Sequence, residues 1–194
     1  MIVQHSVLAF SWIFYCVAHS LLAAPACKLF FEKYTGKYFR YYRLAYSLFA
    51  SFTLLLLLYY QYSIKTWRLF YSGIVVRLAL FLLVIPGLVI MLASIYKYFR
   101  LLSGIRTLYE AKPPAELKVN GMHTYVRHPL YSGTLLFIWG LFFIFPLLGN
   151  LISVVIITLY VLVGIKYEER KLINEFGDTY KNYCLEVPKF IPRI

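Results

Sequence analysis

A short polar segment from Gly121 to Gly133 carries residue types suited to binding a small charged molecule. Pro129 fits the first turn of a helix, where its missing N–H costs nothing, so Arg127 and His128 are expected at a helix N-terminus. The free N–H groups and the positive dipole end found there favour a bound carboxylate or phosphate. The alternative is a basic cluster at the edge of an apolar run that serves only to fix topology.

Glu168 and Glu169 are the only adjacent pair among the eight acidic residues of the chain, and they directly follow its last apolar run. If that run folds back beside the helix that begins at Pro129, both carboxylates lie near Arg127 and His128. Two carboxylates facing an Arg–His pair could hold a zwitterion that carries an amine and a carboxylate. The alternative is an ordinary ion pair at the edge of the run.

A third candidate is His19, which lies beside Ser20 inside the first apolar run. Ionisable side chains are costly inside a membrane and are functional candidates by default. His19 is therefore a candidate for contact with a substrate. The alternative is a histidine that is hydrogen-bonded to a backbone carbonyl or to a tyrosine.

Apolar helices must position these residues, because 61% of the 194 residues are hydrophobic and only 14% are charged. A soluble domain is about 45–50% apolar and about 25% charged, and a membrane-spanning helix needs about 20 mostly apolar residues. We therefore expect an all-α, polytopic integral membrane protein of about five transmembrane helices. The runs lie at about 6–24, 44–62, 70–95, 131–148 and 151–166.

The lengths of these runs leave no room for a separate soluble module, so we expect a single membrane domain over residues 1–194. The third run contains Pro86–Gly87, which predicts a kink. Only Gly149–Asn150 separates the last two runs, which predicts a tight antiparallel hairpin. The hairpin would bring the two polar segments to one face of the membrane.

The net charge of +12 comes from Lys and Arg that lie between the apolar runs. This placement indicates topology and contact with lipid head groups, and not nucleic-acid binding. Because these residues gather in the first and third loops and in the tail, the positive-inside rule predicts an outside N-terminus and a cytoplasmic C-terminus. Cys16, Cys27 and Cys184 are odd in number and lack metal-ligand spacing, so we expect no metal site.

The polar segments occur in a characteristic order. They are Arg127-His128-Pro129-Leu130-Tyr131-Ser132-Gly133, Glu168-Glu169-Arg170, the run Phe176 to Tyr183, and the run Val187 to Pro192. Together they resemble the isoprenylcysteine carboxyl methyltransferase and phospholipid methyltransferase superfamily. The segments 18–23, 42–46, 104–106 and 160–170 are more similar to the methanethiol S-methyltransferase-like branch.

This resemblance implies S-adenosylmethionine as methyl donor and makes residues 101–194 the cofactor-binding core, with residues 1–100 as substrate-side spans. It implies that Glu168 binds the amino-acid end of the donor and that Gly121 forms a tight loop beneath it. The family often has Tyr at the position of His123. The implied cofactor-binding residues are Glu116, Leu117, Lys118, Gly121, His123, Arg127, His128, Pro129, Leu130, Tyr131, Glu168 and Glu169.

Methyl transfer from a sulfonium is an in-line displacement that needs alignment and desolvation. We expect Arg127 and Glu168 to hold the methionine end of the donor, and His19 or Arg43 to deprotonate or orient the acceptor. The carboxyl methyltransferases carry a substrate-binding Arg four residues before the cofactor Glu, where this chain has Gly164. That difference favours a thiol over a carboxylate as acceptor, and a lipid-like acceptor stays open.

Two other functions fit parts of the pattern. An NADPH-dependent sterol-type reductase shares a similar Arg-His-Pro segment, but this chain is short for that class and has no added basic cluster for a 2′-phosphate. A non-enzymatic membrane accessory protein would keep the fold and bind no cofactor.

Overall fold

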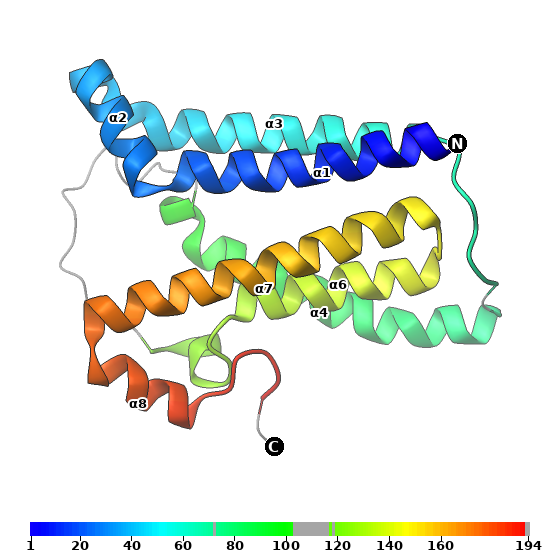
Figure 1. The fold of residues 1–194 in the computed structure, drawn as a ribbon. Coiled ribbons are helices and arrows are strands. Elements are labelled where there is room, and N and C mark those ends of the chain that lie inside the picture. The colour runs from blue at the N-terminus through cyan, green and yellow to red at the C-terminus, as the bar shows by residue number, and fades with distance from the viewer. Residues whose placement is uncertain (72, 103–116, 118, 193–194) are drawn as a thin grey trace. The chain divides into compact units, whose positions relative to one another are not determined.

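A computed structural model describes residues 1–71, 73–102, 117 and 119–192 of the chain (Figure 1). Within these residues there is no named strand, and Arg68 and Leu147 form an isolated β-bridge. The prediction of an all-α protein is therefore confirmed. The helices are α1 (Ile2–Ala23), α2 (Pro25–Thr35), the 3-10 helix η1 (Gly36–Tyr41), α3 (Tyr42–Ser63), α4 (Ile74–Leu102), the 3-10 helix η2 (Gly121–Thr124), α6 (Pro129–Ile144), α7 (Leu148–Phe176) and α8 (Asp178–Glu186).

Four helical stretches of the described chain are long and apolar enough to cross a membrane: Ile2–Ala23, Pro25–Ser63, Ile74–Lys97 and Leu148–Phe176. The fourth predicted span, at about 131–148, corresponds to α6, which is apolar but has only 16 residues. At about 1.5 Å per residue, α6 is about 24 Å long, which is shorter than the hydrocarbon core of about 30 Å. The chain is a polytopic membrane protein, with four full-length candidate spans and one short apolar helix.

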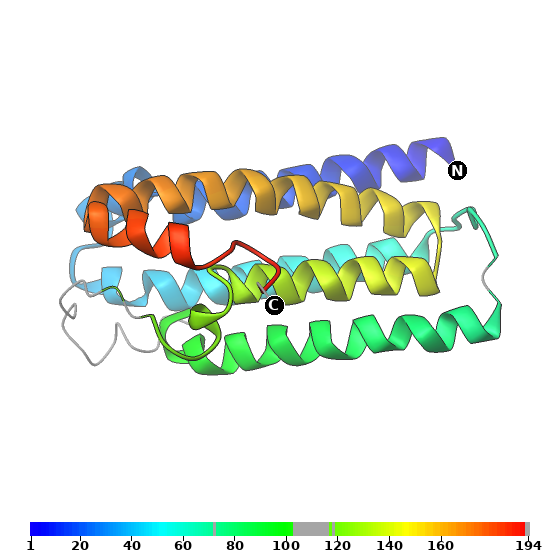
Figure 2. The same ribbon diagram turned by 90° about the horizontal axis from the view of Figure 1, so that it is seen from below.

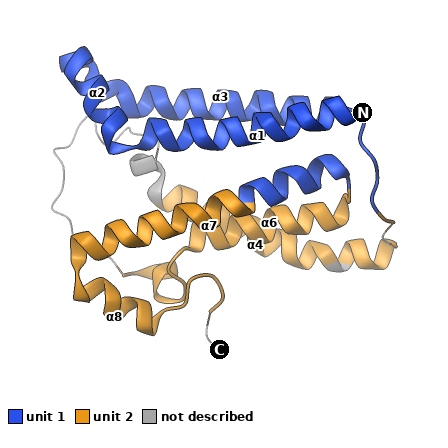
Figure 3. Ribbon diagram, in the orientation of Figure 1, with its two compact units in different colours: residues 1–69, 98–113, 147–157 blue, residues 70–97, 114–146, 158–194 orange. Residues whose placement is uncertain are grey.

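The chain divides into two compact units (Figure 3). The first comprises residues 1–69, 98–113 and 147–157, and the second comprises residues 70–97, 114–146 and 158–194. In the first unit α1 and α3 lie side by side (Figure 1), with a core of Leu8, Trp12, Leu57 and Ile64. Van der Waals contacts among these buried side chains stabilise the pairing of α1 and α3.

Glycines set the distance between α4 and α6 in the second unit. A Cβ atom on Gly133 would lie 2.6 Å from the backbone nitrogen of Met91, and one on Gly87 would lie 2.6 Å from that of Phe137. Small residues allow membrane helices to approach this closely. Pro86 lies inside α4, which continues through it. The contact fixes α6, and therefore the polar segment that precedes it.

The turn between α6 and α7 lies at residues 145–147, and the prediction that Gly149–Asn150 forms it is wrong. α6 ends at Ile144, and both Gly149 and Asn150 lie in the first turn of α7. The physical reason is Pro146, because a proline disfavours the helical conformation of the residue before it. Phe145 accordingly has φ −120° and ψ 76°.

After α7 the chain reverses at Gly177, whose φ of 56° lies in the left-handed region that favours glycine. α8 then runs back along the end of α7 (Figures 1 and 2). Tyr180, Tyr183 and Val187 form a buried cluster against Leu172 and Phe176 of α7. This cluster places the C-terminal segment next to the start of α6.

We predict that Gly133→Ala destabilises the protein. The added methyl group meets backbone atoms, and such overpacking costs about 1–3 kcal/mol. Gly164→Ala in α7 is the matched control, because a Cβ there meets nothing within 4 Å. The change lowers the backbone entropy of the unfolded chain only, which does not destabilise the folded protein. Thermal unfolding in detergent should show a lower Tm for Gly133→Ala alone. Equal Tm values for the two variants would contradict the close α4–α6 packing.

Candidate functional site

The carboxylate of Glu169 is the centre of a cluster of charges in the second unit. Its Oε1 lies 3.0 Å from Nη2 of Arg127 and 3.2 Å from Nε2 of His128, and its Oε2 lies 2.8 Å from Nζ of Lys189. The Glu169 side chain is only 14% exposed. Three partners therefore compensate the cost of burying this charge, and they come from two segments distant from α7 in sequence.

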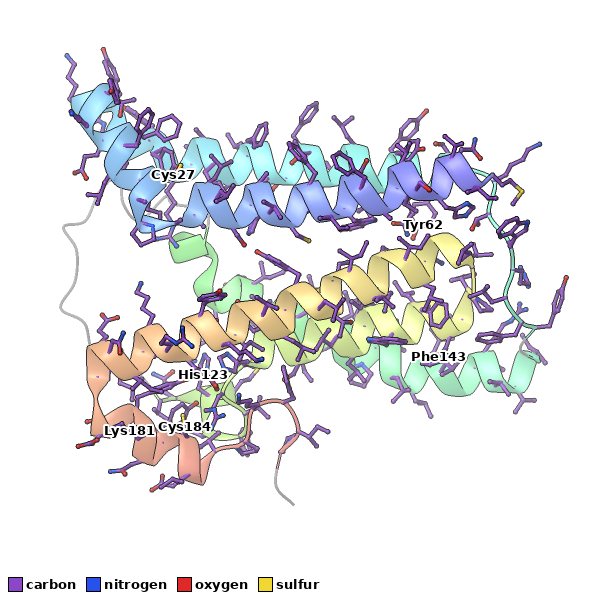
Figure 4. The ribbon with its side chains drawn as sticks, viewed as in Figure 1. Cys27, Tyr62, His123, Phe143, Lys181 and Cys184 are labelled. Carbon is purple, nitrogen blue, oxygen red and sulfur yellow. The ribbon has the colours of Figure 1, made fainter. Side chains whose placement is uncertain are left out.

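Arg127 links Glu169 to the end of α8. Its Nη1 donates hydrogen bonds to the carbonyls of Cys184 (2.7 Å) and Val187 (3.0 Å), which are among the carbonyls left without helical partners at a helix C-terminus. Its side chain is 8% exposed, and its buried Nε has no hydrogen-bond partner among the described residues. Figure 4 labels Cys184 on α8 and His123 on the segment that precedes α6.

The C-terminal segment forms hydrogen bonds with backbone groups just before α6. The N–H of Arg127 donates to the carbonyl of Pro188 (2.8 Å), and that of His128 donates to the carbonyl of Lys189 (3.2 Å). These two N–H groups are therefore not available to an anion, and anion binding by the free N–H groups of the first turn of α6 stays a prediction. The reason is that residues 188–189 pass beside the start of α6. The hydroxyl of Ser132 also donates to the carbonyl of Phe190 (3.0 Å).

Glu168 is in a different environment from Glu169. Its side chain is 45% exposed, and its ion pair with Nδ1 of His128 is long, at 4.0 Å. The hydroxyl of Tyr131 in α6 interacts with its carboxylate. Glu168 is therefore the acidic group of this cluster that keeps access to solvent or to a ligand.

The segment before α6 is fastened at several points. Nζ of Lys97 in α4 donates to the backbone carbonyl (3.1 Å) and the side-chain oxygen (2.7 Å) of Asn120. Gly121 follows with φ +60° and with Lys97 against the position of its missing Cβ. The hydroxyl of Tyr183 donates to the carbonyl of His123 (2.7 Å). These contacts hold the loop between α4, α8 and the cluster around Glu169.

The histidine of this loop has a defined orientation. Nδ1 of His123 lies 3.0 Å from the carbonyl oxygen of Arg127. Desolvation lowers the pKa of His123 below its ordinary value. At neutral pH the imidazole is therefore uncharged.

Several predicted residues occupy supporting positions. Pro129 is buried at the first turn of α6, as predicted, and Leu130 follows it. Leu117 packs against the cluster of Tyr180, Tyr183 and Val187. The predicted contacts of Glu116 and Lys118 lie outside the described residues, as does the segment 104–106.

His19 and Arg43 belong to the first unit. The hydroxyl of Tyr46 lies 2.9 Å from ring nitrogens of His19, which matches the alternative of a histidine bonded to a tyrosine. Both His19 and Tyr46 line a mostly apolar groove of about 380 Å³ between α1 and α3. Arg43 lies in the first turn of α3, close enough to Tyr46 for an electrostatic interaction. Their predicted roles towards an acceptor stay predictions.

Three residues of the site had no predicted role. Lys189 pairs with Glu169, and Tyr183 donates to the carbonyl of His123. Lys97 donates to Asn120, the residue before Gly121. Lys189 stands in a segment that contributed to the family resemblance, which was the available signal. Tyr183 ends another segment of that resemblance, the run Phe176 to Tyr183. Lys97 gave no signal, because it reaches the site through the packing of α4.

We predict that Glu169→Gln and Glu168→Gln differ in stability. Removing the charge of Glu169 leaves Arg127 buried without its counter-ion, which costs about 3 kcal/mol or more. Glu168 is half-exposed, so its substitution should change the free energy of unfolding by less than about 0.5 kcal/mol. Denaturant unfolding in detergent micelles measures both. Equal losses would show that Glu169 is not the structural centre of the cluster.

The chain is similar to known proteins over most of its length. A family model described as NnrU protein matches residues 7–182. The chain is 31% identical over 191 residues to a methanethiol S-methyltransferase of Crocosphaera subtropica, covering 93% of the chain and 71% of that protein. It is 32% identical over 190 residues to methanethiol S-methyltransferase 1 of Bradyrhizobium diazoefficiens, covering 92% of the chain and 63% of that protein.

A further similarity extends over a smaller part of the chain. The chain is 40% identical over 82 residues to a protein-S-isoprenylcysteine O-methyltransferase of Schizosaccharomyces pombe, covering 40% of the chain and 34% of that protein. No solved structure gives a significant match.

Proposed function

Because the chain belongs to the NnrU protein family, we propose that it is an integral membrane methyltransferase that uses S-adenosylmethionine to methylate a thiol. Membership confirms the family resemblance predicted from the sequence. Relatives named methanethiol S-methyltransferase match along most of the chain, which supports S-methylation. The name of the yeast relative supports methyl transfer more generally.

The contrast between the two adjacent glutamates is the observation that carries the proposed donor site. Glu169 is held by Arg127, His128 and Lys189, whereas Glu168 is half-exposed and has one long ion pair. A carboxylate that is near the cluster but not neutralised by it suits the ammonium group of a methionine moiety. We therefore assign the ammonium to Glu168, and give Glu169 a structural role in place of the cofactor contact expected from the sequence.

The other end of the methionine moiety needs a donor for its carboxylate. Two groups fit this requirement. Nε of Arg127 is a buried donor with no partner among the described residues, and Lys189 is 44% exposed beside Glu169. Buried donors in proteins are nearly always hydrogen-bonded, so the donor set of this cluster fits a zwitterionic ligand.

When bound, S-adenosylmethionine supplies an activated methyl group. The residues of this chain then bind, align and desolvate the reactants, which are the requirements of an in-line displacement. Tyr131 and His128 shape the wall beside Glu168. Residue 164 is a glycine and supplies no side chain that could bind an acceptor carboxylate, in agreement with a thiol acceptor.

The protein is an integral membrane protein by its apolar helices. We further propose the orientation in which the N-terminus is outside and the cluster around Glu169 faces the cytoplasm, where the donor is found. The positive-inside distribution of Lys and Arg supports this orientation. The family match does not favour the NADPH-dependent reductase or the accessory protein.

We predict that Glu168→Ala weakens binding of S-adenosylhomocysteine, the product that shares the methionine end. Loss of a charge-assisted hydrogen bond of about 1.5–3 kcal/mol corresponds to roughly a 10-fold to 150-fold higher Kd. Isothermal titration calorimetry in detergent measures this change. Lys181→Ala is the control, because Lys181 pairs with Asp178 at an exposed position on α8. Unchanged affinity in Glu168→Ala would contradict the proposal that Glu168 binds the ammonium group.

Methyl transfer itself is tested with radiolabelled S-adenosylmethionine and purified protein. We expect label in a volatile thioether when a short alkanethiol is the acceptor, and none in an isoprenylated cysteine carboxylate. Label in the carboxylate alone would show that the acceptor is a carboxylate and not a thiol. Protection against heat by NADPH, but not by S-adenosylmethionine, would favour the reductase.

A further inference from the structure

Two short helices, α2 and η1, connect the two spans of the first unit. The spans α1 and α3 each have 22 residues, so each is about 33 Å long and crosses a hydrocarbon core of about 30 Å once. They lie side by side, with α1 ending at Ala23 and α3 beginning at Tyr42 (Figure 1). The residues between them, which form α2 and η1, therefore lie at one surface of the membrane.

The rotation of α2 is fixed by its contacts with the start of α3. Ala24 interrupts the helix with extended backbone (ψ 145°), and Pro25 begins α2. The centroid of the Phe31 ring lies 5.1 Å from that of Tyr42, and Sγ of Cys27 lies 3.6 Å from the Tyr42 hydroxyl. Figure 4 labels Cys27 at this junction. These contacts decide which side chains of α2 remain exposed.

The exposed surface of α2 is largely apolar and aromatic. Leu29, Phe30 and Tyr34 are each more than half exposed. The rings of Phe30 and Tyr34, one turn apart, have centroids 4.7 Å apart and form one aromatic patch. Water does not favour such a patch on a segment outside the spans, whereas the boundary between head groups and acyl chains does.

Basic side chains accompany the aromatic patch. Residues 24–41 contain four basic side chains and one acidic side chain. Nζ of Lys37 lies 5.4 Å from the centroid of the Tyr38 ring, and the guanidinium carbon of Arg40 lies 4.6 Å from that of Tyr41. These four side chains line a hollow of about 270 Å³ in η1. Contact with a ring orients each cation, so two oriented cations share one hollow that complements an anionic group.

An anionic phospholipid matches both features. The cations alone would suit any phosphate, and the aromatic patch alone would suit any lipid. Together, on a segment that two spans hold at the membrane surface, they match a negatively charged head group above an acyl region. A soluble anion would not account for the exposure of Phe30 and Tyr34.

We propose that residues 25–41, the α2–η1 anchor, bind the head groups of anionic phospholipids at the membrane surface. The aromatic patch lies at the boundary with the acyl chains, and Lys33, Lys37 and Arg40 contact the phosphates. The anchor is independent of the proposed methyl transfer, because it belongs to the first unit and the cluster around Glu169 belongs to the second.

The cations are tested by native mass spectrometry of the detergent-solubilised protein, titrated with phosphatidylglycerol or with phosphatidylcholine. Wild type should bind phosphatidylglycerol more tightly than phosphatidylcholine. The triple substitution Lys33→Gln, Lys37→Gln and Arg40→Gln should raise the Kd for phosphatidylglycerol by roughly 10-fold or more, because each cation near an anionic lipid contributes to binding. The Kd for phosphatidylcholine should be unchanged, which shows that the variant is folded.

The matched control removes three exposed cations of α7 and α8, by Lys166→Gln, Lys171→Gln and Lys181→Gln. Both triple variants then have the same net charge, and the control should keep the wild-type affinity for phosphatidylglycerol. An equal loss in both variants would overturn the proposal, because net charge alone would explain it. Equal affinity of wild type for the two lipids would overturn it as well.

The aromatic patch is tested by photocrosslinking in a bilayer. In one variant p-benzoylphenylalanine replaces Tyr34, and in another it replaces Glu32, which lies about 160° away around α2. In vesicles of equal parts phosphatidylcholine and phosphatidylglycerol, irradiation of the Tyr34 variant should add the mass of one phospholipid to the protein. Irradiation of the Glu32 variant should not.

Other products of the photocrosslinking experiment would count against the anchor. Crosslinks from position 34 to another peptide of the chain would show that protein covers the aromatic patch, and would overturn the proposal. Equal lipid adducts at positions 32 and 34, or none at either, would also overturn it. None of these outcomes bears on whether wild type methylates a thiol, so the anchor and the proposed function fail separately.

Discussion

The buried carboxylate of Glu169 is the interaction on which the second unit depends. It lies on α7 and binds side chains from the segment before α6 and from the C-terminal segment. Through Arg127 it also reaches the carbonyls at the end of α8. A charge that is buried this deeply is stable only when its partners are all in place, so the same contacts that neutralise it also hold three distant segments together.

That constraint explains why two chemically identical neighbours have different roles. Successive residues of an α-helix point about 100° apart around its axis, so Glu168 and Glu169 cannot face the same partners. Glu169 is turned into the cluster of cations, and Glu168 remains half-exposed beside Tyr131. Glu169 holds the cluster together, and Glu168 is the carboxylate that we propose binds the methyl donor.

The same arrangement holds the loop that contains His123 in one position. It is fastened by Lys97 at one end, by Tyr183 in the middle and by Arg127 at the other end. The close approach of α4 and α6 at their glycines sets the distance between two of the elements involved. A methyl transfer that depends on alignment benefits from a loop with fixed positions for its polar atoms.

The sequence by itself determined the helical class, the apolar runs and the family, because hydropathy and the ordered polar segments are local properties of the chain. The hairpin expected from the sequence also predicted that Arg127, His128, Glu168 and Glu169 lie at one site. Only the tertiary structure decided that Glu169 is neutralised, that the N–H groups before α6 are occupied, and that Lys97 and Lys189 belong to the site. Those outcomes depend on helix rotation and on contacts between residues far apart in sequence, which no local pattern encodes.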